Sequence, residues 1–325
     1  MRFATATALV VGLFLAVSIS LALGAVSLPL TDVWRGLAGT GDAMAVSIVR
    51  ELRLPRTALG ALVGAALGAS GTALQSTLRN PLAEPYLLGV SGGAAVGAVL
   101  ATAAGLTALG AISVFAFAGA LGAVGLVLLL ARQSPGSRDP RTLLMAGVVT
   151  GAFANAVIMV ALAQASANEQ RGALWWMMGS IAAARWHDVA WLGSALVVLG
   201  GMLAHLARDL DVVALGPETA SSLGVDADRA ASRFFLLASL LAAATVSTAG
   251  LVGFVGLIVP HLARAVTRRA SARAAIFAAA ALGAMLVLAA DIVARAAVPP
   301  AELPLGAITA LLGVPFFLWQ LRRIR

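Results

Sequence analysis

The residue types that carry most protein chemistry are few in this chain and are not grouped for catalysis. Cysteine is absent, so the chain has neither a disulfide nor a thiolate metal site. His187, His205 and His261 are scattered, and no pair has metal-ligand spacing. Lysine is also absent, which excludes a Walker A loop, whose lysine reaches nucleotide phosphates. We expect no metal, no cofactor and no enzyme activity, and if ATP drives this protein, another chain must hydrolyse it.

The basic residues are arginines next to apolar runs. They give the chain a net charge of +8. Anionic lipid headgroups attract basic side chains at helix ends, so the charge needs no nucleic acid to explain it. We therefore expect membrane lipid, and not nucleic acid, around this protein.

The composition is that of a membrane protein. Hydrophobic residues make up 61% of the 325 residues and charged residues only 11%, so the bilayer is the main solvent. The long uncharged runs are residues 3–31, 57–78, 85–131, 142–168, 189–207, 234–263, 274–290 and 303–321.

The run lengths predict a single all-helical membrane domain over residues 1–325 with about ten crossings. At about 20 residues per crossing, the run 85–131 must divide, near residues 105–110. The run 234–263 predicts a full helix followed by a short one broken by glycines and Pro260. The first run is too long for a signal-peptide core and predicts a retained helix. An even number of crossings places both termini on one side, and the excess of arginine on that side predicts that it faces the cytoplasm.

The most specific pattern lies in residues 53–93. An uncharged run rich in glycine and serine, residues that let helices approach closely in lipid, leads into a polar turn punctuated by prolines. Its R-x-P-R start from Arg53 to Arg56, its S-G-x-x-x-Q centre from Ser70 to Gln75 and its N-P-L-A-x-P turn, residues 80–85, form one compound motif. This motif resembles the permease subunits of the ABC importers that carry ferric siderophores, haem and cobalamin.

The resemblance implies a type II ABC importer permease fold that forms a homodimer. The implied partners are a second copy of the chain, two ATP-binding cassette ATPase subunits and a periplasmic or lipid-anchored substrate-binding protein. The implied location is the bacterial cytoplasmic (inner) membrane, with several crossings. A ferric siderophore ranks first as substrate because that branch is the broadest, and haem and cobalamin remain alternatives because all three branches share the motif.

A polar loop on the predicted cytoplasmic side, residues 208–233, contains the sequence GPETASSLG. Pro217 suits a first helical turn, Glu218 favours the positive N-terminus of a helix, and Gly224 suits a C-terminal cap. These features alone indicate a capped surface helix. The loop also resembles the EAA-type coupling motif of ABC importers, which implies contact with the ATPase through Pro217, Glu218, Ala220, Ser221 and Gly224.

Three arginines, Arg53, Arg56 and Arg295, stand next to membrane ends on the opposite side. The resemblance implies that they receive acidic residues of the two lobes of the substrate-binding protein. The alternative is that they anchor the helix ends to lipid headgroups. Asp291 lies four residues before Arg295, a spacing that predicts an ion pair on one helix face.

The resemblance places the substrate path at the axis of the homodimer. It implies a cytoplasmic constriction at Asn80 and Leu82 and at the start of the fifth crossing, where the family's hydroxylated residue followed by arginine is reversed to Arg141 then Thr142. It also implies an outer closure at Trp176 and Met178, for which an interfacial aromatic belt is the alternative. Asn155 is either a helix-to-helix contact or part of the channel lining.

Two other classes of protein remain as alternatives. An ion-coupled secondary transporter also uses broken helices, but it needs a buried acidic residue, and the sequence predicts none at membrane depth. A membrane serine protease is suggested by Ser70 in Gly-Ala-Ser-Gly, with His261 as its possible partner. Helix packing already explains these glycines, and ten crossings are too many for the rhomboid protease core.

Overall fold

The computed structural model describes residues 3–24, 28–106, 108–133, 140–268, 271–299 and 301–321. Nearly all of them are helical. In chain order the helices are α1 (Phe3–Ala22), α2 (Leu30–Ala38), α3 (Ala43–Ser47), η1 (Ile48–Arg53), α4 (Leu54–Thr77), η2 (Pro85–Leu88), α5 (Val90–Ala103), α6 (Leu109–Gln133), α7 (Pro140–Gln164), α8 (Ala167–Met177), α9 (Trp186–Ala195), η3 (Leu196–Gly200), α10 (Gly201–His205), α11 (Ala207–Ala214), α12 (Pro217–Ser222), α13 (Ala227–Ala249), α14 (Val255–Thr267), α15 (Ala272–Ala296) and α16 (Leu305–Leu321).

The predicted set of crossings is confirmed. Among the described residues, 7 continuous helical segments are long and apolar enough to span a membrane, and α5, α14 and α16 are shorter apolar helices. The apolar run of residues 85–131 divides between Ala103 and Leu109, as its length requires. The run of residues 234–263 forms most of α13 and the shorter α14, with Pro260 inside α14.

The centre of the bundle is the packing of α4 against α15 and α14. A Cβ atom on Gly64 would collide with the backbone carbonyl of Gly283 in α15, and one on Gly71 would collide with that of Gly256 in α14. Glycine therefore lets these backbones touch, which is how helices associate in lipid when hydrophobicity no longer distinguishes a partner from the solvent. α13 packs on the same helix, and its side chains are also mostly buried.

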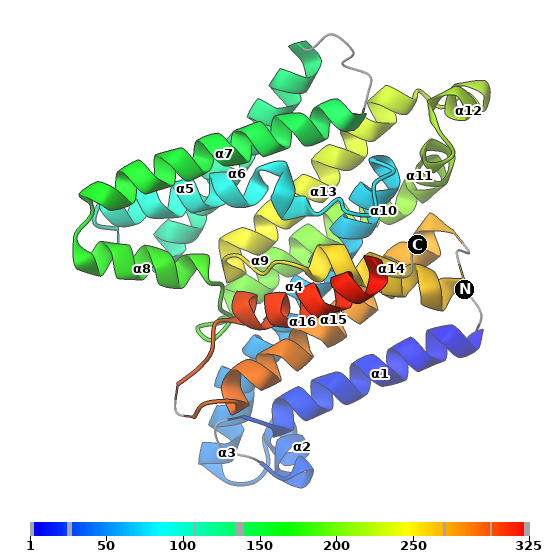
Figure 1. Ribbon diagram of the computed structural model, residues 1–325. Helices are drawn as coiled ribbons and strands as arrows, with labels where there is room; N and C mark the ends of the chain where they lie inside the picture. The colour runs from blue at the N-terminus through cyan, green and yellow to red at the C-terminus, as the bar shows by residue number, and fades with distance from the viewer. Residues whose placement is uncertain are drawn as a thin grey trace.

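A second layer, formed by α5, α6 and α7, covers one side of this core (Figure 1). α5 and α6 are as close as α4 and α15, because a Cβ atom on Gly97 would meet the carbonyl of Phe115. α7 lies further out and leaves large apolar side chains exposed, such as Phe153 at 65% and Met159 at 73%.

The bundle has two distinct ends (Figure 1). The start of α1 and the end of α16 lie at the same end as α11 and α12, which we call the α12 end. α2, α3 and α8 lie at the other, which we call the α8 end. The two chain ends therefore share one side, as an even number of crossings requires.

Candidate functional site

A group of charged side chains is buried at the α8 end, where α4 begins and α15 ends. Arg56 donates to Oδ1 of Asp291 from Nε at 3.0 Å and from Nη2 at 2.8 Å. Its Nη1 and Nη2 also donate to the two carboxylate oxygens of Glu302, each at 2.8 Å. The Asp291 side chain is only 1% exposed and that of Arg56 12%. We call Arg53, Arg56, Asp291, Arg295 and Glu302 the outer charge cluster.

The other two arginines of the cluster are held by α1. Nε of Arg295 lies 3.1 Å from Oδ2 of Asp291, and its Nη2 donates to the carbonyl and the hydroxyl of Ser20, each at 3.2 Å. Nη1 of Arg53 donates to two carbonyl oxygens at the end of α1, at 2.7 and 2.9 Å. Arg53 is 7% exposed and Arg295 6%. Buried charges of this kind are stable only when they are paired and hydrogen-bonded.

These contacts bear on the predicted roles of the arginines. The ion pair between Asp291 and Arg295 is confirmed. In this structure Arg53, Arg56 and Arg295 bind groups of their own chain, so a partner's carboxylates would have to exchange with those groups. The docking role stays a prediction. Their burial also distinguishes them from solvated headgroup anchors such as Arg35, which is exposed.

Glu302, in the loop between α15 and α16, is the most accessible member of the cluster, with 41% of its side chain exposed. The hydrogen bonds from Arg56 hold the pKa of this carboxyl below its usual value, because they favour its charged form. No sequence pattern singled out this residue, since a glutamate in a loop after a helix has many ordinary roles.

The N-P-L-A-E-P turn follows α4 toward the α12 end. The Asn80 side chain accepts a hydrogen bond from the backbone N–H of Leu82 at 2.9 Å, and Leu82 itself is 44% exposed. Nε2 of His261 in α14 lies 3.1 Å from the carbonyl oxygen of Pro81. The turn is therefore fastened to α14 and presents Leu82 at its surface, as a constriction residue requires. This contact with a backbone carbonyl agrees with the structural role that the sequence favours for His261.

Glu84 is an acidic residue buried inside the bundle, which the sequence pattern did not indicate. This side chain is 7% exposed, and its Oε1 accepts the backbone N–H of Phe254 at 2.6 Å. Phe254 directly precedes α14, so by helical rise it lies about 20 Å along that helix from Thr267. The polar turn folds back into the bundle after Asn80, a path that the sequence pattern does not specify.

The other predicted part of the constriction lies at the start of α7, which begins at Pro140. Arg141 and Thr142 are in the first turn of this helix, and Thr142 is half-buried. The side chain of Arg141 lies outside the described part of the structure. The role of both residues stays a prediction.

The outer closure predicted by the sequence corresponds to α8, a short helix that begins with a capping box. The hydroxyl of Ser166 accepts the backbone N–H of Glu169, and the Glu169 carboxylate accepts that of Ser166. Trp176 is half-buried and Trp175 is 59% exposed. The backbone carbonyl of Met178 accepts the N–H of Gly306 at 3.1 Å, which ties the end of α8 to the start of α16.

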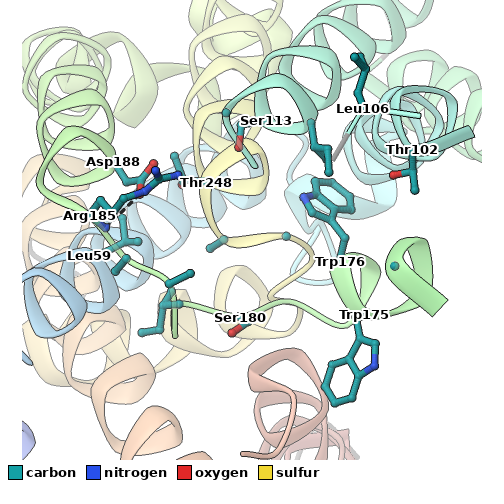
Figure 2. A pocket seen from close by; sticks show the side chains of 18 of the residues that line it. Leu59, Thr102, Leu106, Ser113, Trp175, Trp176, Ser180, Arg185, Asp188 and Thr248 are labelled. Atoms are coloured by element: carbon teal, nitrogen blue, oxygen red, sulfur yellow. Dashed lines mark hydrogen bonds between the residues drawn. The ribbon is translucent and has the colours of Figure 1, made fainter. Parts of the chain in front are cut away.

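A cavity of about 490 Å³ lies behind α8, among the ends of α5 and α13 and the starts of α6 and α9. Figure 2 shows the Trp176 ring inside it, near Leu106 and Thr102, while the Trp175 ring points the other way. Arg185 and Asp188 lie on the opposite wall, where the Arg185 backbone N–H donates to the Asp188 carboxylate at 3.0 Å. The Trp176 ring therefore projects into a cavity inside the chain, whereas the Trp175 ring is largely exposed.

A second cavity, of about 370 Å³, is lined by α7 together with η2 and α5. Asn155 stands on its wall and is exposed in the single chain. The residue is about 14 Å along α7 from Gln164, so it lies in the middle of a spanning helix. A polar amide at this depth is costly against lipid, which favours a helix partner or a water-filled path.

The coupling motif forms α12 and the turn after it, and the predicted helix limits are confirmed. Pro217 is the first helical residue, and Gly224 adopts the left-handed conformation, with φ 80°, that ends such a helix. Ala220 is fully buried against the bundle. Pro217, Glu218, Ser221 and Gly224 are exposed, and so are the flanking side chains of Leu215 at 64% and Leu223 at 60%. The sequence analysis did not include these two leucines in the site.

The fold and these sites define a membrane transport protein. The described residues form 7 apolar segments long enough to span a membrane and three shorter apolar helices, with polar groups facing cavities and an exposed helix at one end. A model of the FecCD transport family matches residues 12–323. The chain therefore belongs to the FecCD transport family. The resemblance carried by residues 53–93 is confirmed, and the protein is an ABC permease with a type II importer permease fold.

Individual relatives cover almost the same range. The cobalamin import system permease protein BtuC of Halobacterium salinarum is 44% identical over 275 residues, covering 85% of this chain and 73% of that protein. The hemin transport system permease protein HmuU of Yersinia pestis is 40% identical, with 93% and 90% covered. A solved metal-chelate type ABC transporter in an inward-facing conformation has a TM-score of 0.88 and 28% identity, with 98% of each chain covered.

Proposed function

We propose that this chain is the permease subunit of an importer that moves an intact metal chelate across the bacterial cytoplasmic membrane. Two chains would form the path, and ATP hydrolysis on two separate ATPase subunits would switch it between outward-open and inward-open states. The observation that carries the proposal is the combination of family membership with α12, a helix that is fixed to the bundle at Ala220 and otherwise exposed.

The exposure of α12 supports an ATPase contact. Leu215 and Leu223 flank the helix as two exposed apolar side chains, and Glu218 stands in its first turn. Ala220 fixes the helix to the bundle, so the segment is both presented outward and held in place. A short exposed helix flanked by two apolar side chains is the kind of surface that docks into a groove of a partner protein.

Replacing Gly224 by arginine tests this contact. A Cβ atom on Gly224 meets nothing within 4 Å, so an arginine has room there. The left-handed φ of 80° costs the variant about 1–2 kcal/mol, which the fold should tolerate, and the new side chain would keep the ATPase away. We expect at least a tenfold loss of ATP-dependent transport and of ATPase binding in detergent. Gly105→Arg is the matched control, because Gly105 has φ 76°, equally open surroundings and a position at the α8 end. Normal ATPase binding by Gly224→Arg would refute the assignment.

The homodimer is supported by α7. Its exposed apolar side chains and mid-membrane Asn155 suit a helix that faces a second copy across a path. In this arrangement Asn155 would line the path, Asn80 and Leu82 would narrow it at the α12 end together with the start of α7, and Met178 would lie near its opposite mouth.

The α12 end is proposed to face the cytoplasm, where ATP is available. The arginine distribution supports this orientation, and it places both termini inside. In this cysteine-free chain, single cysteines at Arg268 and Gly41 provide the check. The first should react only from the cytoplasm and the second only from outside.

The substrate proposal is a metal chelate of the ferric siderophore, haem or cobalamin class, with the siderophore as the sequence-based first choice. The relatives are named for cobalamin and hemin, and all three ligands enclose a metal within an organic chelator. Specificity in such systems is set by the binding protein. A thermal-shift screen of that protein against the three ligands would therefore decide the substrate.

One observation favours the alternative, an ion-coupled secondary transporter: the side chain of Glu84 is buried. A buried carboxyl at membrane depth is a common coupling group in that class. The two classes differ in their energy source, and this difference can be measured directly.

A further inference from the structure

Glu84 has a feature that its place in the turn of residues 80–85 does not explain. Its carboxylate is buried, and it accepts a hydrogen bond from the backbone of a residue 170 positions away, the N–H of Phe254 at 2.6 Å. A buried carboxylate is stabilised when it accepts backbone N–H groups at the positive end of a helix. Glu84 thus caps α14 from a distant part of the chain.

The cap is needed because α14 begins at a strained position. Phe254 precedes the helix with φ 66°, in the left-handed region that bulky residues rarely adopt, and its side chain makes no capping hydrogen bond. Such a conformation persists only when its surroundings hold it in place. Two contacts do so: the Glu84 carboxylate on the N–H, and Gly313 of α16, where a Cβ atom would collide with the Phe254 ring.

The loop of residues 250–254 links this capped position to the end of α8. A Cβ atom on Gly250 would collide with the carbonyl of Trp176, and one on Gly306 would collide with the carbonyl of Leu251. The backbone N–H of Ser180 also donates to the carbonyl of Ala249 at 2.8 Å. The backbone of this loop is therefore packed directly against α8 and α16.

The other side of Glu84 belongs to the turn of residues 80–85. His261 contacts the Pro81 carbonyl in the same turn. The turn is therefore held both at the start of α14, through Glu84, and further along that helix, through Pro81. A Cβ atom on Gly256, near the start of α14, would also press against the Pro85 ring. The Glu84 hydrogen bond is therefore a direct polar link between the turn near the α12 end and the loop that leads to the α8 end.

We propose that Glu84 is a positioning residue that makes the turn of residues 80–85 and the loop of residues 250–254 move as one body during transport. It does not contact the substrate. The inference rests on the proposed transport function, in which the turn narrows the path near the cytoplasm and the end of α8 lies near the outer mouth. Through this link, displacement of the turn is transmitted to the outer closure, so that ATP use and substrate passage stay coupled.

The first measurement needs no transport. Hydrogen exchange of purified protein should show the peptide that contains Phe254 exchanging at least tenfold faster in Glu84→Ala than in wild type. Glu84→Gln keeps a side-chain carbonyl that can accept the N–H and should restore protection. Thr245→Ala is the control, since Thr245 is buried in α13 and its hydroxyl bonds within its own helix. Unchanged exchange in Glu84→Ala would refute the link.

The second measurement uses the full complex with its ATPase and binding protein in nanodiscs and proteoliposomes. The substrate moved per ATP hydrolysed should fall at least threefold in Glu84→Ala and recover in Glu84→Gln. A parallel loss of both activities at a constant ratio would mean that Glu84 only supports folding, and would overturn the proposal. If Glu84→Ala is not recovered folded, Glu84→Asp, which is too short for the bond, replaces it. A wild-type complex that does not transport would refute the proposed function and leave the exchange result intact.

Discussion

α4 and α7 are helices of similar length, 24 and 25 residues, and both are apolar, yet they lie in opposite surroundings. α4 is buried on nearly every side, whereas α7 exposes Phe153, Met159 and other large side chains. In lipid, hydrophobicity does not decide which helix is central, because the solvent is as apolar as the partner. Small residues that allow backbone contact, and polar groups that find partners, make the difference.

The largest difference between the two helices is expected when one glycine in each is replaced by leucine. Gly64 in α4 meets the backbone of Gly283, so Gly64→Leu cannot be accommodated by a side-chain movement. We expect a cost at or above about 3 kcal/mol and little folded protein. Gly151 in α7 has nothing within 4 Å of its missing Cβ, and Gly151→Leu should fold normally. Fluorescence-detected size exclusion measures both, and equal yields would contradict the account.

The next largest effect should come from removing a carboxylate of the outer charge cluster, where α4 begins and α15 ends. Asp291→Ala leaves Arg56 and Arg295 buried without their shared carboxylate. Breaking a buried pair in this way costs about 3–5 kcal/mol. We expect a much lower melting temperature in nanodiscs. Asn155→Leu in α7 is the matched change. It should leave the melting temperature of the chain within a few degrees and lower transport instead, and a large loss of stability there would show that Asn155 belongs to the core.

The smallest effect on stability is expected for Glu302, the most exposed residue of the outer charge cluster. Because Arg56 lowers the pKa of Glu302 in the folded state, the ion pair stabilises the protein fully above the unfolded pKa, near 4.5. This contribution is lost as the pH falls through the lower folded value. With 41% of the side chain exposed, it should be about 1 kcal/mol or less. The difference in melting temperature between wild type and Glu302→Gln should shrink below pH 4.5, and a constant difference would exclude the ion pair.

The sequence predicted the crossings and the limits of α12, because these depend on local signals: run length, Pro217 at a helix start and Gly224 at a helix end. It did not predict the burial of Arg53, Arg56 and Arg295, whose partners Ser20 and Glu302 come from other segments. The burial of Glu84 in the polar turn of residues 80–85 was not predicted either, because its partner also comes from another segment. Its partner, the N–H of Phe254, lies 170 residues away and has no side-chain signature.

The central claim is that ATP hydrolysis on another chain drives uptake of a metal chelate through this permease. The direct test is uptake of labelled chelate into proteoliposomes that hold the permease, its ATPase and its binding protein, with ATP or with a proton gradient supplied in separate samples. The account predicts uptake with ATP, none with the gradient alone, and at least a tenfold loss in Gly224→Arg. Uptake driven by the gradient without ATP would contradict it and would identify a secondary transporter.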